Sequence, residues 1–237
     1  MSIYFSDVEL YFSDSVFGNT IEIADEEFHH IKDVMRHKLG DEAFVTDGKG
    51  VIYKTEIERF DKKSLSAKII STTNYPNHLS NIIFCIPRLR SADRFEFALE
   101  KCVELGITNF IVFDSQRTVA KGEKLDRWQK ILTAAMKQSL RSWLPNVKYC
   151  KSVNEIMELE GKKFLFDQNA EQTFSSILNS QSSISNCFFL FGPEGSFSNE
   201  ELRVRNEGTK IRLTENRLRS ETAIITAASI LATSLTQ

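Results

Sequence analysis

The sequence predicts an α/β protein of two domains, a mostly β domain over residues 1–73 and an α/β domain with a mostly parallel sheet over residues 78–237. Short apolar runs separated by turn residues fill the first part, whereas strand-like and helix-like runs alternate in the second. A polar stretch that contains a proline, residues 72–77, separates the two patterns. Alternating strands and helices favour a parallel sheet with helices on both faces.

Three apolar runs of the N-terminal domain are typical of strands. They cover residues 43–46, 52–57 and 65–70. The first two are separated by Asp47-Gly48-Lys49-Gly50, and Asp-Gly suits the tight turn of a β-hairpin. One helix is expected from about residue 26 to residue 36. Short, evenly spaced strands of this kind indicate a small β-barrel.

The C-terminal domain alternates predicted strands and helices. The strands are expected at residues 82–87, 107–113, 164–167, 187–191 and 211–214. The helices are expected at residues 92–105, 125–141, 153–159, 199–206 and from about 220 onward, with a short one in the serine-rich stretch 175–185. The last helix carries small residues on several sides, which indicates burial in the core or at a subunit interface.

One strand of this domain opens into a glycine-containing turn that favours ligand binding. The apolar run 187–191 is typical of a strand covered on both faces, and Gly192-Pro193-Glu194-Gly195 follows it. Glycine permits backbone angles closed to other residues, and its lack of a side chain lets a ligand approach the backbone. Ser198 stands three residues before Glu201, the spacing of a capping box. Open α/β sheets bind ligands at such strand ends, although an ordinary tight turn has the same spacing.

Charge is nearly balanced over the whole chain but unevenly distributed. The formal net charge is −2. Basic residues dominate residues 117–151, and acidic residues dominate residues 152–209. A strongly basic segment predicts a polyanionic partner.

Other features exclude several classes of protein. No apolar run approaches the roughly 20 residues that a membrane-spanning helix needs, and the N-terminal stretch lacks the pattern of a signal peptide. The four cysteines and four histidines have no metal-ligand spacing. We therefore expect a cytoplasmic protein with reduced thiols, no membrane partner and no metal.

Segments along nearly the whole chain resemble those of the SPOUT methyltransferases. The two most specific are Gly192-Pro193-Glu194-Gly195-Ser196-Phe197-Ser198 and Arg217-Leu218-Arg219-Ser220-Glu221-Thr222-Ala223. More narrowly, the chain resembles the bacterial family that methylates N3 of a uridine in 16S rRNA. The further shared segments are residues 30–36 with Gly40-Asp41, residues 100–106, and residues 127–131 with Gln138-Ser139.

The resemblance implies a fold, a cofactor and partners. It implies a PUA-like barrel associated with RNA, followed by a SPOUT domain whose chain end forms a trefoil knot and pairs two subunits into a homodimer. The implied methyl donor is S-adenosylmethionine, and the implied substrate is 16S rRNA or the 30S subunit. By the same resemblance, the cofactor contacts are Phe166, Phe191, Gly192, Pro193, Glu194, Gly195, Leu213, Asn216, Leu218 and Arg219.

Methylation at uridine N3 requires loss of a proton, so three side chains beside these turns become candidate catalytic residues. Glu194 or Glu221 could accept the proton or orient the base. Alternatively, Glu194 bonds a neighbouring backbone N–H, and Glu221 stabilises a helix start through the helix dipole. Arg219 could neutralise the developing uridine anion or bind a phosphate. Its alternative is an ion pair with Glu215 or Glu221.

Basic clusters on both domains predict where RNA binds. Several of these residues share one helix face within residues 127–141, and such a stripe is alternatively a solvated surface. Clusters on two domains suit a folded RNA that is recognised through its backbone. The candidate RNA-binding residues are Arg36, Lys38, Arg88, Arg94, Arg117, Arg127, Lys130, Lys137 and Arg141.

The chain departs from the family pattern at three places, and two rival functions stay open. A second glycine is common where Ser196 stands, a small residue is usual where Leu140 stands, and a basic residue is often found near the N-terminus, where residues 1–5 have none. One rival is a catalytically silent RNA-binding or ribosome-assembly protein, which a pocket blocked at Ser196 would favour. The other is a SPOUT enzyme that methylates the ribose 2′-oxygen.

Overall fold

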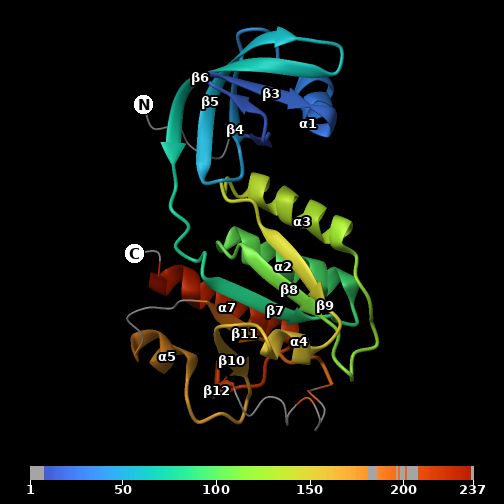
Figure 1. The fold of residues 1–237 in the computed structure, drawn as a ribbon, viewed down its shortest axis with the longest axis vertical. Helices are drawn as coiled ribbons and strands as arrows, with labels where there is room; N and C mark the ends of the chain where they lie inside the picture. Colours follow the sequence, from blue (N-terminus) through green and yellow to red (C-terminus); the bar gives the residue numbers. More distant parts are fainter. Residues whose placement is uncertain (1–7, 181–185, 196, 198–200, 202–207, 236–237) are drawn as a thin grey trace. The chain divides into compact units, whose positions relative to one another are not determined.

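The computed structural model describes residues 8–180, 186–195, 197, 201 and 208–235. Two compact units make up the chain (Figure 1). The first comprises Met1–Asn77 with Met136–Leu144, and the second comprises His78–Ala135 with Pro145–Gln237. Nothing in the sequence pattern indicated that Met136–Leu144 joins the first unit.

The first unit contains a six-stranded sheet with the order β1-β4-β5-β6-β3-β2. Its strands are β1 Leu10–Phe12, β2 Val16–Phe17, β3 Thr20–Ala24, β4 Glu42–Thr46, β5 Val51–Phe60 and β6 Ser64–Asn74. Neighbouring strands are antiparallel except β1 and β4, which are parallel. The three predicted strands are confirmed as parts of β4, β5 and β6. The short strands β1, β2 and β3 were not predicted.

The predicted helix of this unit has two geometries. It begins as α1, Asp25–His29, and continues as a π-helical turn, η2, His30–Val34. Phe28 and Ile31 are buried in a core with residues of the sheet such as Ile23. The helix is therefore held on the sheet by its apolar side chains.

A close approach of two backbones fixes Met136–Leu144 in the first unit. The Gly50 N–H donates to the Ser142 carbonyl at 2.9 Å, and the Trp143 indole donates to the Tyr75 carbonyl at 2.8 Å. Gly50 has a φ of +94°, and a Cβ at this position would lie 2.4 Å from the Trp143 ring. Only glycine fits there, because both the backbone angle and the space exclude a side chain.

The second unit contains a six-stranded sheet with the order β12-β10-β11-β7-β8-β9, in which every neighbouring pair is parallel. The strands are β7 Ile82–Pro87, β8 Asn109–Phe113, β9 Asn146–Cys150, β10 Lys162–Phe166, β11 Cys187–Leu190 and β12 Thr209–Ile211. This sheet confirms the predicted α/β class. Strand β9 was not predicted, because it carries charged and polar residues between its apolar ones.

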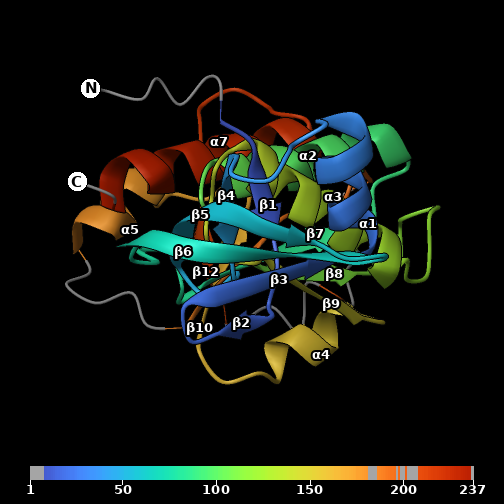
Figure 2. The ribbon, with the colours of Figure 1, turned by 90° about the horizontal axis from the view of Figure 1, so that it is seen from above.

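Helices cover both faces of the parallel sheet. They are α2 Ala92–Glu104, α3 Leu125–Gln138, α4 Val153–Met157, α5 Phe174–Ser180 and α7 Ser220–Leu235. Helix α4 packs Val153 and Ile156 against sheet residues such as Leu165. Helices α2 and α7 lie across the sheet from α4 (Figure 2). The predicted helix 199–206 lies outside the described residues except Glu201. Over the part of the chain that the structure describes, no helix is long and apolar enough to cross a membrane.

Candidate active site

A cavity of about 540 Å³ lies at the carboxyl ends of three neighbouring parallel strands, β12, β10 and β11. Phe166 is the last residue of β10, Phe191 follows β11 and Leu213 follows β12. Parallel strands end at the same edge of a sheet, so residues distant in sequence meet here. Arg94 of α2 and the first residues of α7 complete the wall. All the residues expected to contact the cofactor line this cavity except Gly195 and Asn216.

Two aromatic rings form one wall of the cavity. The Phe166 and Phe191 rings are nearly parallel, with an angle of 17° between their planes and 4.7 Å between their centroids. Phe191 is buried and also contacts Phe84, whose ring centroid lies 5.1 Å away. The packing fixes both rings, and Phe166, which is half-buried, offers a rigid apolar surface to a ligand.

Gly192 and Gly195 do not use the left-handed backbone angles that glycine permits. Neither is among the glycines with positive φ. A Cβ on Gly192 would make only an ordinary contact with the Phe197 ring, at 3.5 Å, whereas a Cβ on Gly195 would lie 3.3 Å from the Cβ of Arg117. Glycine therefore serves close approach in this turn: Gly192 leaves room in the cavity, and Gly195 lets Arg117 pack against the backbone.

Hydrogen bonds connect the loops around the cavity. The Ser220 hydroxyl donates to the Gly192 carbonyl at 2.9 Å, which fixes the glycine turn to the start of α7. The Gln168 amide donates to the Glu215 carbonyl at 2.8 Å and so joins the loops after β10 and β12. Asn216 lies outside the wall, and its carbonyl accepts a hydrogen bond from Thr214. Gln168 and Ser220 were missed because a sequence does not show which backbone carbonyl a polar side chain will reach.

The three candidate catalytic residues line the same cavity. Glu221 lies in the first turn of α7 and faces Arg94, with 3.7 Å between Oε1 and the arginine Nε. Its other oxygen, Oε2, is buried and accepts no hydrogen bond within the described chain. Glu194 is exposed to the cavity. Among the described residues, neither Glu215 nor Glu221 forms an ion pair with Arg219, so its guanidinium is available to a ligand.

Arg88 lies where it cannot readily meet a phosphate, in contrast to its predicted role in RNA binding. The side chain is buried, with its guanidinium over the rings of Phe95 at 5.5 Å and Trp128 at 5.0 Å. It donates to the Gly122 carbonyl at 3.3 Å, and burial lowers its pKa. Sequence reasoning missed this because apolar partners of a basic side chain are set by tertiary packing.

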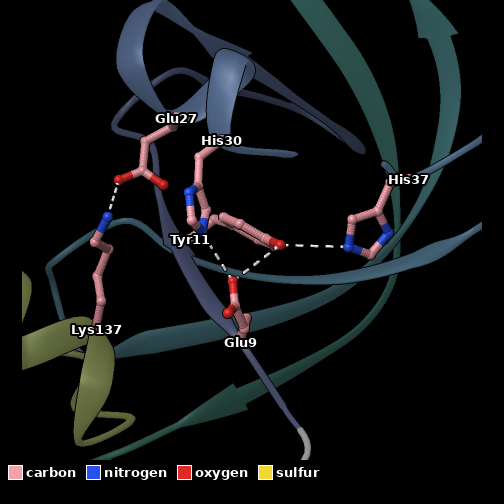
Figure 3. Close-up of polar contacts among 6 residues, drawn as sticks. All are labelled: Glu9, Tyr11, Glu27, His30, His37 and Lys137. Carbon is pink, nitrogen blue, oxygen red and sulfur yellow. Dashed lines mark hydrogen bonds and ion pairs between the residues drawn. The ribbon is translucent and has the colours of Figure 1, made fainter. Parts of the chain in front are cut away.

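The other predicted RNA-binding residues differ in their surroundings. Arg127 forms a bidentate ion pair with Glu96, at 2.6 and 2.8 Å, and Lys137 is paired with Glu27 (Figure 3). Arg94 faces Glu221, and Arg117 donates to the Gly195 carbonyl at 3.2 Å. Arg141 is half-buried, and burial lowers its pKa, whereas the side chains of Lys130, Arg36 and Lys38 are exposed.

The structure describes neither Ser196 nor Ser198, so the expected effects of these residues are not tested. Within the described ranges, no group of three or more His, Cys, Asp or Glu side chains is placed to hold a metal ion.

Comparison with known proteins identifies the family. The model of an RNA methyltransferase domain matches residues 76–232, and that of an RNA methyltransferase PUA domain matches residues 23–70. The ribosomal RNA small subunit methyltransferase E of Bacillus subtilis is 29% identical over 228 residues, which cover 90% of this chain and 89% of the relative. A crystal structure of a protein described only as hypothetical has a TM-score of 0.84 and 30% identity, covering 96% of this chain and 98% of the other.

A third relative was solved with a ligand. The ribosomal RNA small subunit methyltransferase E of Neisseria gonorrhoeae, bound to S-adenosyl methionine, has a TM-score of 0.82 and 24% identity, covering 95% of this chain and 97% of the other. Its fold agrees with the present one over both units. Because the RNA methyltransferase domain spans more than half of the sequence, this chain belongs to the RNA methyltransferase family.

Proposed function

We propose that the protein transfers the methyl group of S-adenosylmethionine to N3 of a uridine in 16S rRNA. The observation that carries the proposal is the cavity at the ends of β10, β11 and β12, which gathers the glycine turn, an aromatic wall and three polar side chains in a chain of the RNA methyltransferase family. The relatives named as ribosomal RNA small subunit methyltransferase E support the choice of substrate.

The residues around the cavity fit S-adenosylmethionine. The half-buried Phe166 ring, packed on Phe191, suits the flat adenine, and the backbone at Gly192 can be approached closely because glycine has no side chain of its own. When bound, the sulfonium group supplies an activated methyl group and a good leaving group. The chain then has to hold donor and base in line and exclude water.

Glu221 and Arg219 have complementary roles in this proposal. The buried Oε2 of Glu221 lacks a hydrogen-bond partner in the described chain, and such an acceptor suits the N3 proton of uridine. The neighbouring Arg94, whose Nε lies 3.7 Å from Oε1, helps to hold the carboxylate in place. Arg219 can donate to the uracil oxygens that carry the negative charge once the proton has left. Glu194, exposed in the wall of the cavity, is the second candidate acceptor.

The proposal includes a homodimer, a trefoil knot near the chain end, and a place in the cytoplasm with the 30S subunit as substrate. The buried small residues Ala227 and Ala228 of α7 support close packing of this helix. Gel filtration with light scattering gives the oligomeric state directly. A monomer that still transfers methyl groups would remove the dimer from the proposal.

The test of the function is transfer of labelled methyl from S-adenosylmethionine to 30S subunits that lack the modification, followed by nucleoside analysis. Naked 16S rRNA serves as the parallel substrate. We expect the label in 3-methyluridine. Label on a ribose 2′-oxygen would support the rival SPOUT reaction, and RNA binding without any transfer would support a catalytically silent protein.

A further inference from the structure

A short segment of the first unit, Val34 to Leu39, exposes apolar and basic side chains together. Val34 and Leu39 are each 63% exposed and Met35 is 41% exposed. Arg36 and Lys38, which lie among them, are also exposed. In the described part of the chain neither cation forms an ion pair, in contrast to Arg127 and Lys137. We call residues 34–39 the exposed segment.

The backbone of the exposed segment is strained at Arg36. Arg36 has a φ of +58°, in the left-handed region, where the chain turns out of the π-helical turn η2. The His37 N–H donates to the Ile31 carbonyl at 3.1 Å across this turn. Glycine is the usual residue where a helix ends in this way. Another residue costs roughly 1 kcal/mol there, a cost that an RNA contact of the arginine side chain would offset.

A hydrogen-bonded network fixes the exposed segment to the rest of the unit (Figure 3). The His37 ring has its Nε2 3.3 Å from the Tyr11 hydroxyl and its Nδ1 3.7 Å from Asp41. Tyr11 also donates to Glu9 at 3.4 Å, and the same Glu9 oxygen lies 3.1 Å from His30 Nε2. Burial raises the pKa of Tyr11, so the phenol stays protonated and can donate. The segment is therefore held in place before any partner binds.

The charges around the exposed segment leave its cations free to act on a partner. Asp33 is paired with His29 at 3.1 Å. Asp41 accepts a hydrogen bond from the Lys38 N–H at 2.7 Å and faces His37. The carboxylates near the segment are thus engaged, while the side chains of Arg36 and Lys38 are exposed to solvent.

We propose that the exposed segment binds an unpaired stretch of the RNA substrate. Arg36 and Lys38 contact phosphates, and Met35 and Leu39 pack against an unstacked base. Cations spaced along a backbone match the charges of RNA, and unpaired bases offer the apolar faces that a protein can cover. The inference rests on the proposed function, since its partner is the RNA of that reaction, and it adds a contact surface on the first unit to the methyl-transfer cavity of the second.

The test compares Arg36→Gly with the unchanged protein. Glycine removes the cation and also relieves the backbone strain, so a loss of RNA binding cannot be a consequence of unfolding. We expect the KM for RNA in methyl transfer to rise about tenfold, with an unchanged KM for S-adenosylmethionine and an unfolding midpoint that is equal or higher. In filter binding of a 16S rRNA transcript, the slope of log affinity against log salt concentration should fall by the contribution of about one phosphate contact.

Two further variants separate the effect of the Arg36 cation from the effect of backbone strain and from that of the apolar Leu39 side chain. Asn186→Gly relieves another left-handed residue, with a φ of +47°, in the second unit and is the matched control, for which RNA binding should not change. Leu39→Ser should weaken RNA binding without changing its salt dependence, because it removes an apolar contact only.

Three other outcomes overturn the inference, and a fourth overturns only the proposed function. Unchanged RNA affinity of Arg36→Gly would show that the side chain is not used for RNA. Normal binding to naked 16S rRNA with reduced methylation of 30S subunits would assign the segment to a protein of the subunit. A changed oligomeric state of Leu39→Ser would assign it to a second copy of the chain. If the unchanged protein transfers no methyl group but Arg36→Gly still binds the transcript more weakly, the proposed function fails and this inference stands.

Discussion

The glycine turn of the cavity and the exposed segment of the first unit differ in how the residue type matches the backbone angle. In the turn, Gly192 and Gly195 take backbone angles open to any residue. In the segment, Arg36 takes a left-handed angle that favours glycine. Glycine is thus found at two positions whose φ does not require it, whereas arginine is found at a position whose φ favours glycine.

The difference shows what decides each residue type. At the turn, the constraint is space, because a ligand cavity lies beside Gly192 and Arg117 packs against Gly195. At the exposed segment, we propose that the constraint is the RNA contact made by the Arg36 side chain. Gly50 is the third case, in which backbone angle and space both require glycine. The comparison predicts that substitutions at these places separate stability from function.

The largest effect is expected for Arg219→Ala in the cavity. In the proposed function Arg219 donates to the charge that develops on uracil, and removal of such a donor typically lowers kcat by roughly 100- to 1,000-fold. Side-chain truncation at an exposed position should leave the unfolding midpoint nearly unchanged. Single-turnover methyl transfer measures the effect. A loss confined to the KM for RNA would instead make Arg219 a phosphate contact.

The next effect is on stability, at Gly50. Alanine would be strained at a φ of +94° and would overlap the Trp143 ring, so we expect a loss of about 3 kcal/mol in the free energy of unfolding. Urea denaturation measures it. Gly18→Ala is the control, because Gly18 has a φ of +57° and a Cβ there would have nothing within 4 Å, so this variant carries only the backbone strain. Equal losses for the two variants would show that the contact with Trp143 adds nothing.

Much of the fold was predictable because its signals are local. The strand β7 agrees with the predicted residues 82–87, and α2 was predicted to within one residue. The short strands β1 and β2 carry too few residues for a periodic pattern to emerge. The π-helical turn at His30 was predicted as ordinary helix, because the hydrogen bond from Met35 to the His30 carbonyl depends on packing around it.

The candidate site was predictable only as a set of segments. Resemblance supplied Phe191, Gly192 and Arg219, and parallel strands bring them to one edge of the sheet. Which side chains pair across that edge, as Arg94 does with Glu221, depends on tertiary geometry that no spacing encodes. For the same reason the basic stripe on α3 did not reveal that Arg127 is already engaged by Glu96.

A smaller effect is expected for Gly192→Ala, which tests whether glycine is required in the turn to leave room for the ligand. The new methyl group meets only the Phe197 ring, at an ordinary 3.5 Å, so the free energy of unfolding should change little. We expect the affinity for S-adenosylmethionine to fall about tenfold, equivalent to about 1.4 kcal/mol. Isothermal titration calorimetry measures it. A destabilised protein with unchanged affinity would show that Gly192 serves the fold.

The smallest effect is expected for Arg127→Ala, which sharpens the contrast between paired and unpaired cations. Arg127 is engaged by Glu96, so its loss should raise the KM for RNA by less than about threefold, well below the change expected for Arg36→Gly. Steady-state methyl transfer with RNA as the varied substrate measures both variants. A tenfold rise would mean that Arg127 leaves Glu96 to bind RNA.

The same pair has a pH dependence of known sign. The hydrogen bond from Arg127 lowers the pKa of Glu96 below its ordinary value of about 4.5. Since the folded-state pKa is the lower one, the pair stabilises the protein above the ordinary value, and this contribution is lost as the pH falls through the folded-state pKa. Glu96→Gln should therefore lose less stability than the unchanged protein between about pH 7 and pH 3. Thermal unfolding at both pH values measures the difference, and equal losses would show that the exposed pair contributes nothing to stability.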